Sequence, residues 1–225
     1  MAAARGGGEF PPEAPFRAVV FDLDGTLVDS EPRSHAAWRR VFEARGTVPD
    51  EALILSFVGR RGQDVLALLA ERLPDLDPDA LMAEAAAHAN APGLPPTEPM
   101  PGAVDLVREI HRRGLPLGLV TSAGRRYAER MLARLGVRDL FSVIVGAEDV
   151  TVGKPDPEGY ARACRDLGVE AAACVAFEDA PAGIAAVKAA GMYCVAVATT
   201  HEPDDLAAAD LVVPGLTAVT WPLAP

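Results

Sequence analysis

The stretch VVFDLDGTLVDSEP, residues 19–32, places two aspartates at the end of an apolar run and follows them at once with glycine. A buried strand gains nothing from Asp22 and Asp24, because two close carboxylates repel each other and are costly to remove from water. The sequence therefore indicates that this pair has a chemical task and that positively charged groups compensate for it.

Apolar runs rich in β-branched residues recur along the chain and alternate with helical patterns. Strands that are apolar almost throughout, rather than at every second residue, are typical of a parallel sheet covered on both faces. The alternation predicts an α/β fold with a doubly wound parallel sheet. The expected strands are residues 17–24, 115–122, 141–148, 173–179, 193–199 and 210–214, and the expected helices are residues 102–113, 124–135, 157–167, 181–190 and 203–208.

Residues 31–96 interrupt this alternation, because they show helical patterns and no convincing strand. Each helical pattern ends at Gly, Pro or Asn, which are common helix terminators. These patterns cover residues 34–46, 62–73 and 77–90. The block predicts a small α-helical cap domain inserted into a Rossmann-like core, which would comprise residues 16–30 and 97–225 after a disordered leader at residues 1–15.

The composition narrows the partners and the compartment. The 225 residues are half apolar, carry a net charge of −11 and contain no long basic run, so neither nucleic acid nor an anionic membrane is an expected partner. No stretch reaches the roughly 18 apolar residues of a membrane span, and the N-terminus lacks the apolar region of a signal peptide. Three widely spaced cysteines without metal-binding spacing predict reduced thiols. A cytoplasmic, monomeric protein is expected.

Polar side chains recur where the expected strands end, which is where open α/β sheets bind ligands. Thr121 and Ser122 end the second apolar run, Lys154 follows the third, and Glu178 and Asp179 end the fourth. Each alone has an ordinary explanation as a turn residue, a helix cap or a solvated lysine. Their occurrence together at successive strand ends favours a single site.

The chemistry of this set is that of phosphoryl transfer. Asp22, Asp24 and Asp179 would form a carboxylate cluster that needs a cation, and oxygen ligands of this kind suit Mg²⁺. Lys154 would offset the remaining charge, while Thr121 and backbone N–H groups at the next helix start would hold phosphoryl oxygens. One carboxylate would act as the nucleophile and form an aspartyl phosphate, and another would transfer the proton.

Four motifs in order extend this interpretation to a family. Residues 17–215 resemble the haloacid dehalogenase superfamily, and within it the β-phosphoglucomutase-like branch with a helical cap. The motifs that carry the resemblance are FDLDGTLVDSEP, LVTSAG, GKPDP and FEDAPAGI. All four together, at sensible spacing, are much more specific than the first motif alone.

The resemblance implies a role for each acidic residue. Asp22 is similar to the nucleophile and Asp24 to the general acid/base, whose backbone carbonyl also contacts the metal. Asp179 resembles a direct ligand of Mg²⁺, and Glu178 a second, water-mediated partner. The paired aspartates imply a phosphatase or a mutase, because a dehalogenase has no phosphate for a second aspartate to help release.

The resemblance also implies the residues that bind substrate. Thr121 and Lys154 match the phosphate-binding pair, and Ser122 adjoins them. In the cap, a glycine-flanked loop is expected to face the site and to contact the leaving group, although a solvated loop remains the alternative. The cap residues concerned are Gly59, Arg60, Arg61 and Gln63.

Departures from the mutases of this branch favour hydrolysis. Those mutases carry a histidine on the first cap helix, where this chain has Ser34, and His35 follows one position later, a turn of about 100°. Val58 replaces a lysine that holds their second phosphate. The sequence therefore predicts a Mg²⁺-dependent phosphatase that acts on a small phosphorylated metabolite, most simply a sugar phosphate. The alternatives are a β-phosphoglucomutase-like sugar phosphomutase and, less favoured, a non-catalytic binding protein. His201 is expected to face solvent.

Overall fold

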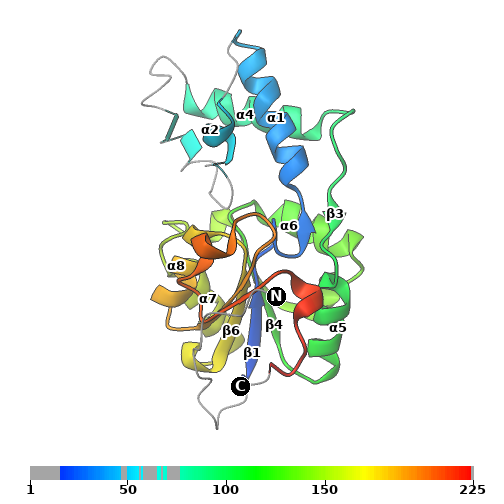
Figure 1. Cartoon of the computed structure of the whole chain (residues 1–225), viewed down its shortest axis with the longest axis vertical. Helices are drawn as coiled ribbons and strands as arrows, with labels where there is room; N and C mark the ends of the chain where they lie inside the picture. Colours follow the sequence, from blue (N-terminus) through cyan, green and yellow to red (C-terminus); the bar gives the residue numbers. More distant parts are fainter. Residues whose placement is uncertain are drawn as a thin grey trace.

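The computed structural model describes residues 16–46, 50–55, 57, 65–66, 68–69 and 77–223. It consists of an α/β core and a helical insertion that lies above one end of the core (Figure 1). This arrangement confirms the α/β fold class, the parallel sheet and the helical insertion that the sequence predicts.

A six-stranded parallel sheet forms the centre of the core, with the strand order β5-β4-β1-β6-β7-β8. Its first strand in the chain lies in the middle, paired to β4 on one side and to β6 on the other. The ends of β1 and β6 are therefore neighbours, which positions the residues that follow each strand. The strands are β1 (Ala18–Phe21), β4 (Leu117–Val120), β5 (Phe141–Val145), β6 (Cys174–Glu178), β7 (Tyr193–Val197) and β8 (Leu211–Val213).

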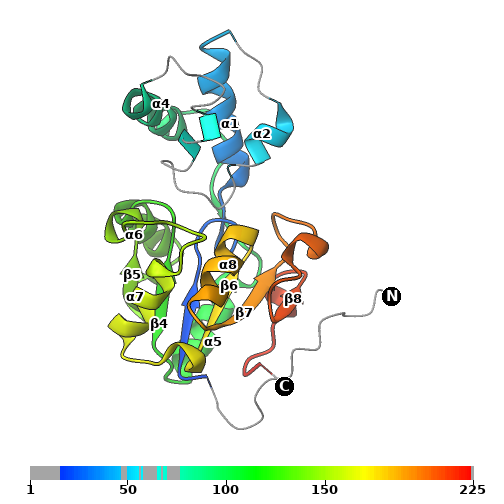
Figure 2. The same ribbon diagram turned by 90° about the vertical axis from the view of Figure 1, so that its left-hand side faces the viewer.

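Helices cover both faces of the sheet and make a three-layered core (Figure 2). Alternate side chains of β1 point to opposite faces: Val19 and Phe21 pack with α5 and α6, whereas Ala18 and Val20 pack with α7 and α8. The aromatic rings of Phe21 and Phe177 stack with their centroids 4.9 Å apart. The core helices are α5 (Ala103–Arg112), α6 (Arg125–Arg134), α7 (Glu158–Leu167) and α8 (Pro181–Ala189).

The predicted strands and helices of the core agree with the structure in type and order, apart from shifted ends and one predicted helix that is absent. The first strand ends at Phe21, so the two aspartates of the opening motif leave the sheet instead of finishing the strand. Residues 203–208 are not an α-helix: a short 3₁₀ helix, Pro203–Leu206, takes their place. Two acidic residues in its first turn are exposed, and Leu206 alone is buried, so the segment has too small an apolar face to support a longer helix. The other 3₁₀ helices are Arg138–Leu140, Ala147–Asp149, Ala171–Ala173 and Leu216–Ala218.

The insertion contains α1 (Glu31–Glu43), α2 (Glu51–Leu55) and α4 (Pro78–Asn90). It has a small core of its own, in which the rings of Trp38 and Phe57 lie 5.0 Å apart. The helix expected at residues 62–73 falls mainly outside the described residues, and α2 was not predicted. No helix in the described part of the chain combines the length and the apolar character needed to cross a membrane.

Two chain crossings join the insertion to the core, and they lie side by side as a two-stranded antiparallel ribbon of β2 (Val28–Asp29) and β3 (Glu98–Pro99). Arg33 strengthens the second crossing, because its guanidinium donates hydrogen bonds to the carbonyl oxygens of Ala89 (2.7 Å) and Pro95 (2.9 Å). The cap boundaries at residues 31 and 96 remain predictions, and the expected leader, residues 1–15, lies outside the described residues.

Glu31 is the first residue of α1 and is largely buried at this junction, with 16% of its side chain exposed. Its Oε2 lies 3.1 Å from Nε2 of His35 on the next turn. Burial, together with the nearby carboxylates of Asp179, Asp24 and Asp29, raises the pKa of Glu31 to about 8. The charged form of Glu31 is therefore disfavoured in the folded state.

We predict that Glu31→Gln stabilises the protein in a pH-dependent manner. The folded state keeps the Glu31 proton up to about pH 8, whereas an unfolded chain loses it near pH 4.5. Glu31 therefore costs stability as the pH rises through this window, and the full cost is present above it. Glu31→Gln should raise Tm by roughly 2 to 6 °C at about pH 8.5 and leave it unchanged at about pH 4.

Thermal unfolding followed by circular dichroism would measure this difference. Glu43→Gln, an exposed change on the same helix, is the control and should have no effect at either pH. An equal gain in Tm at both pH values would contradict the prediction, because it would arise from packing rather than from ionisation.

Candidate active site

Asp22 and Lys154 form a buried ion pair at the carboxyl end of the sheet. Asp22 follows β1, and the Nζ of Lys154 donates a hydrogen bond to its Oδ1. The same Nζ lies 2.5 Å from Oε1 of Glu178. The other oxygen of Asp22, Oδ2, is buried without a hydrogen-bond partner among the described residues. A buried carboxylate oxygen in this situation needs a ligand to compensate for its lost hydration.

Glu178, at the end of β6, is held by groups from both neighbouring helices. The hydroxyl of Tyr160, on α7, donates a 2.5 Å hydrogen bond to its Oε1. On α8, Gly183 leaves the space that the carboxylate occupies, because a Cβ there would lie 2.0 Å from the Glu178 Cδ. Glycine at position 183 is therefore required for a buried glutamate at 178.

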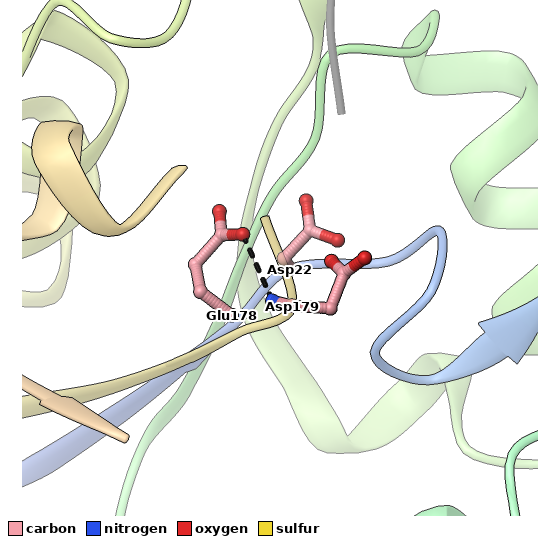
Figure 3. Close-up of side chains that lie close together, drawn as sticks. All are labelled: Asp22, Glu178 and Asp179. Atoms are coloured by element: carbon pink, nitrogen blue, oxygen red, sulfur yellow. Dashed lines mark hydrogen bonds between the residues drawn. The ribbon is translucent and has the colours of Figure 1, made fainter. Parts of the chain in front are cut away.

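Asp179 completes a cluster of three buried carboxyl groups (Figure 3). Each of Asp22, Glu178 and Asp179 offers one oxygen, and these oxygens lie within 4.8 Å of one another. The backbone N–H of Asp179 donates a 3.2 Å hydrogen bond to Oε2 of Glu178, drawn as the dashed line in Figure 3. The hydroxyl of Thr26 donates to Asp179 Oδ1 at 3.2 Å.

The electrostatics of this cluster favour a bound cation. Burial raises the pKa of Asp22 well above its usual range despite the opposing effect of Lys154. Burial and the charge of Glu178 raise the pKa of Asp179 to about 7. Burial alone would lower the pKa of Lys154, but Asp22 and Glu178 raise it overall, so this lysine stays charged. Three carboxylates and one ammonium group leave a negative site with hard oxygen donors, and the unpartnered Oδ2 of Asp22 fits a divalent metal ion.

The Asp24 carboxylate contacts hydroxyl groups rather than the three clustered carboxyl groups. Its Oδ1 accepts hydrogen bonds from the hydroxyls of Ser30 (2.6 Å) and Tyr127 (2.9 Å). Burial raises the pKa of Asp24, and these two bonds oppose the rise. Ser30 lies at the cap junction and Tyr127 lies on α6, so Asp24 links the cap to the core. Sequence reasoning missed Tyr127, because no local pattern shows that a tyrosine 103 positions away reaches this aspartate.

A cavity of about 1270 Å³ opens over the site between the core and the cap. Thr121 and Ser122 line its floor after β4, and the Thr121 hydroxyl accepts a 3.0 Å hydrogen bond from the N–H of Ala123. Ser34 and Trp38, both on α1, line the cap side. Asp22 and Asp24 also face this cavity, so a molecule bound there would reach both carboxylates.

The structure brings together part of the predicted site. Asp22, Lys154, Glu178 and Asp179 are in contact, and Asp24, Thr121 and Ser122 share the adjoining cavity. The expected cap residues lie outside the described residues: Gly59, Arg60, Arg61 and Gln63. His201, which was expected to face solvent, is half-buried, and its Nδ1 lies 3.1 Å from the backbone oxygen of Asp179.

Comparison with known proteins places this geometry in a family. Residues 16–191 match the haloacid dehalogenase-like hydrolases. The validoxylamine A 7'-phosphate phosphatase of Streptomyces hygroscopicus subsp. limoneus is 43% identical over 207 residues, which cover 92% of this chain and 97% of that protein. The fructose-1-phosphate phosphatase YqaB of Escherichia coli (strain K12) is 36% identical and covers 81% of this chain and 96% of that protein.

The fold agrees with the same family. The crystal structure of β-phosphoglucomutase from Clostridium difficile superimposes with a TM-score of 0.80 at 24% identity, covering 92% of this chain and 94% of that one. The family match, the relatives and the buried acidic cluster agree. The chain belongs to the haloacid dehalogenase-like hydrolases, in the β-phosphoglucomutase-like branch, and it is a phosphatase of phosphoric monoesters.

Proposed function

We propose that this phosphatase hydrolyses a sugar phosphate or a similar polyol phosphate through an aspartyl phosphate on Asp22. The observation that carries the proposal is the buried Asp22–Lys154 pair, which opens onto a cavity between the cap and the core. Lys154 binds one oxygen of Asp22, which orients the carboxylate and favours its charged form against the effect of burial. An oriented carboxylate without its water shell is a competent nucleophile toward phosphorus.

The reaction has two steps. In the first, a carboxylate oxygen of Asp22 bonds to phosphorus, the bond from phosphorus to the ester oxygen breaks, and Asp24 gives its proton to that oxygen. In the second, water attacks phosphorus, Asp24 takes a proton from the water, and the Asp22–phosphorus bond breaks to release phosphate. Burial raises the pKa of Asp24, and this supports the role because it favours the protonated form that the first step needs.

Mg²⁺ is the proposed cofactor. Asp22 and Asp179 would hold it together with the backbone carbonyl of Asp24, and Glu178 would act through water. A bound Mg²⁺ would neutralise charge on the phosphoryl oxygens during transfer. Thr121 and the N–H groups at the start of α6, with Ser122 beside them, would hold the phosphoryl oxygens that remain.

Hydrolysis is favoured over the mutase reaction by the cap side of the cavity. Ser34 lines the cavity, whereas the neighbouring His35 is paired with Glu31. A serine cannot supply the acid/base group that the mutases place at this position. The relatives support a sugar-like substrate, because their names specify validoxylamine A 7'-phosphate and fructose 1-phosphate. The cavity has ample room for molecules of this kind.

Phosphate release from a panel of phosphomonoesters, with Mg²⁺, tests this proposal. The panel would include fructose 1-phosphate, a hexitol phosphate and validoxylamine A 7'-phosphate. β-Glucose 1-phosphate with catalytic glucose 1,6-bisphosphate would be assayed both for phosphate and for glucose 6-phosphate. Phosphate without glucose 6-phosphate is the expected result. Glucose 6-phosphate without phosphate would establish the mutase instead.

Asp22→Asn should lower kcat by at least about a thousandfold, because the amide cannot form the aspartyl phosphate. The variant should fold as stably as the wild type or more so, because burial opposes the charged form of Asp22. EDTA should stop the wild-type reaction and added Mg²⁺ should restore it. Asp105→Asn, an exposed change on α5, is the matched control. Activity of Asp22→Asn within about tenfold of the wild type would exclude Asp22 as the nucleophile.

Tyr127→Phe should lower kcat about tenfold for sugar phosphates, because Asp24 loses a hydrogen bond that fixes its position. With p-nitrophenyl phosphate, the loss in the first step should be much smaller, because that leaving group departs without a proton. Tyr193→Phe, on β7 and away from the cavity, serves as the control. Equal losses of kcat/KM, which reports the first step, on both kinds of substrate would contradict a role through Asp24 in protonating the leaving group.

A further inference from the structure

The loop after β7 contributes a second set of contacts to the acidic cluster. It contains three consecutive polar residues, Thr199, Thr200 and His201, and none belongs to the four motifs of the family resemblance. The hydroxyl of Thr199 donates a 2.6 Å hydrogen bond to the backbone oxygen of Gly25. The hydroxyl of Thr200 donates to Oδ2 of Asp179. The loop therefore reaches both the segment after β1 and the segment after β6.

These contacts hold the Asp179 carboxylate in one orientation. Thr26 donates to Oδ1 and Thr200 to Oδ2, so each oxygen has its own hydroxyl donor. Gly25 closes the third side: a Cβ at this position would lie 2.1 Å from Oδ2 and 2.9 Å from Cγ2 of Thr200. A positive φ of 86° at Gly25 allows the backbone to approach this closely.

His201 determines how the Thr200 hydroxyl uses its single proton. Its Nδ1 lies 2.9 Å from the Thr200 Oγ1 and 3.1 Å from the backbone oxygen of Asp179. A carbonyl oxygen only accepts, so an Nδ1–H on His201 satisfies both contacts as a donor. The Thr200 oxygen then accepts from His201, and its proton goes to Oδ2 of Asp179, which lies closer to the hydroxyl than the backbone oxygen of Asp179 does at 3.2 Å. The three groups form a chain of hydrogen bonds that ends on the carboxylate.

We propose that Thr200, oriented by His201, is a positioning residue that presents the Asp179 carboxylate to the divalent cation. The inference rests on the metal site of the proposed function and assigns new residues to it. Hydrogen-bonded partners that orient metal ligands commonly contribute 10- to 100-fold, as an order of magnitude, to metal affinity. Without the Thr200 hydroxyl, Asp179 would lose the donor to Oδ2 and rotate about its side-chain torsions, and binding would then have to restore its order.

Metal affinity of the resting protein tests the proposal without relying on turnover. Mn²⁺ accepts the same oxygen ligands as Mg²⁺, and its free concentration can be followed by electron paramagnetic resonance. Thr200→Val keeps the shape of the side chain and removes the hydroxyl, so the Kd for Mn²⁺ should rise by about tenfold or more. Thr200→Ser restores the hydroxyl and should recover most of this loss. Thr220→Val, an exposed change, is the matched control.

The Mg²⁺ dependence of activity distinguishes a loss of metal positioning from a general disturbance of the active site. The concentration of Mg²⁺ that gives half-maximal activity should rise with the Mn²⁺ Kd in Thr200→Val, while the substrate KM at saturating Mg²⁺ stays near that of the wild type. His201→Ala should shift the Mn²⁺ Kd in the same direction, by about threefold or more. His201→Ala also provides the test if Thr200→Val does not fold, as judged by circular dichroism.

The outcomes distinguish this inference from the proposed function. If folded Thr200→Val binds Mn²⁺ as tightly as the wild type, the role of Thr200 is overturned and the metal site stands. If Thr200→Val does not fold, the same result in folded His201→Ala has the same meaning. A wild-type protein that binds no Mn²⁺ would overturn the metal site and, with it, this inference. If Thr200→Ser loses as much Mn²⁺ affinity as Thr200→Val, the role of Thr200 is also overturned, because the hydroxyl is then not the group responsible.

Discussion

Three carboxyl groups lie buried together where β1 and β6 end, with their oxygens within 4.8 Å of one another, and the rest of the site follows from that crowding. Because Phe21 pairs with Phe177, the residues after the two strands are forced into proximity. Lys154 is the cation that the described part of the chain places among them. Mutual repulsion and burial raise the pKa values of Asp22 and Asp179, and a divalent cation relieves both effects.

The residues that support the cluster come from different layers of the core. Tyr160 and Gly183 come from the helices on one face of the sheet, and they fix Glu178 by a hydrogen bond and by leaving space. Thr200 comes from the loop after β7 and fixes Asp179. Tyr127, from the other face, fixes Asp24. The site is thus assembled from every layer of the core.

The sequence was sufficient to predict the residues whose neighbours along the chain identify them. The aspartates after β1 and the acidic pair after β6 interrupt apolar runs, and parallel strands bring such interruptions together. Lys154 lies before a proline in the loop that follows the third of these runs. Tyr127 and Thr200 could not be predicted in this way, because an isolated tyrosine or threonine near a helix or turn has many ordinary uses. The β2–β3 ribbon was missed for a related reason: two-residue strands carry no periodicity.

That ribbon has a consequence for how the insertion is joined to the core. Both crossings between the two domains lie in one pair of short strands, Val28↔Pro99 and Asp29↔Glu98, and the sheet neighbours β1 and β4 are joined across them. The inserted segment therefore begins and ends at nearly the same point in space. The strand order of the sheet therefore does not depend on the length of the segment inserted at this point. The cap side of the cavity and the carboxylate cluster thus come from separate stretches of the chain, which meet at this one ribbon.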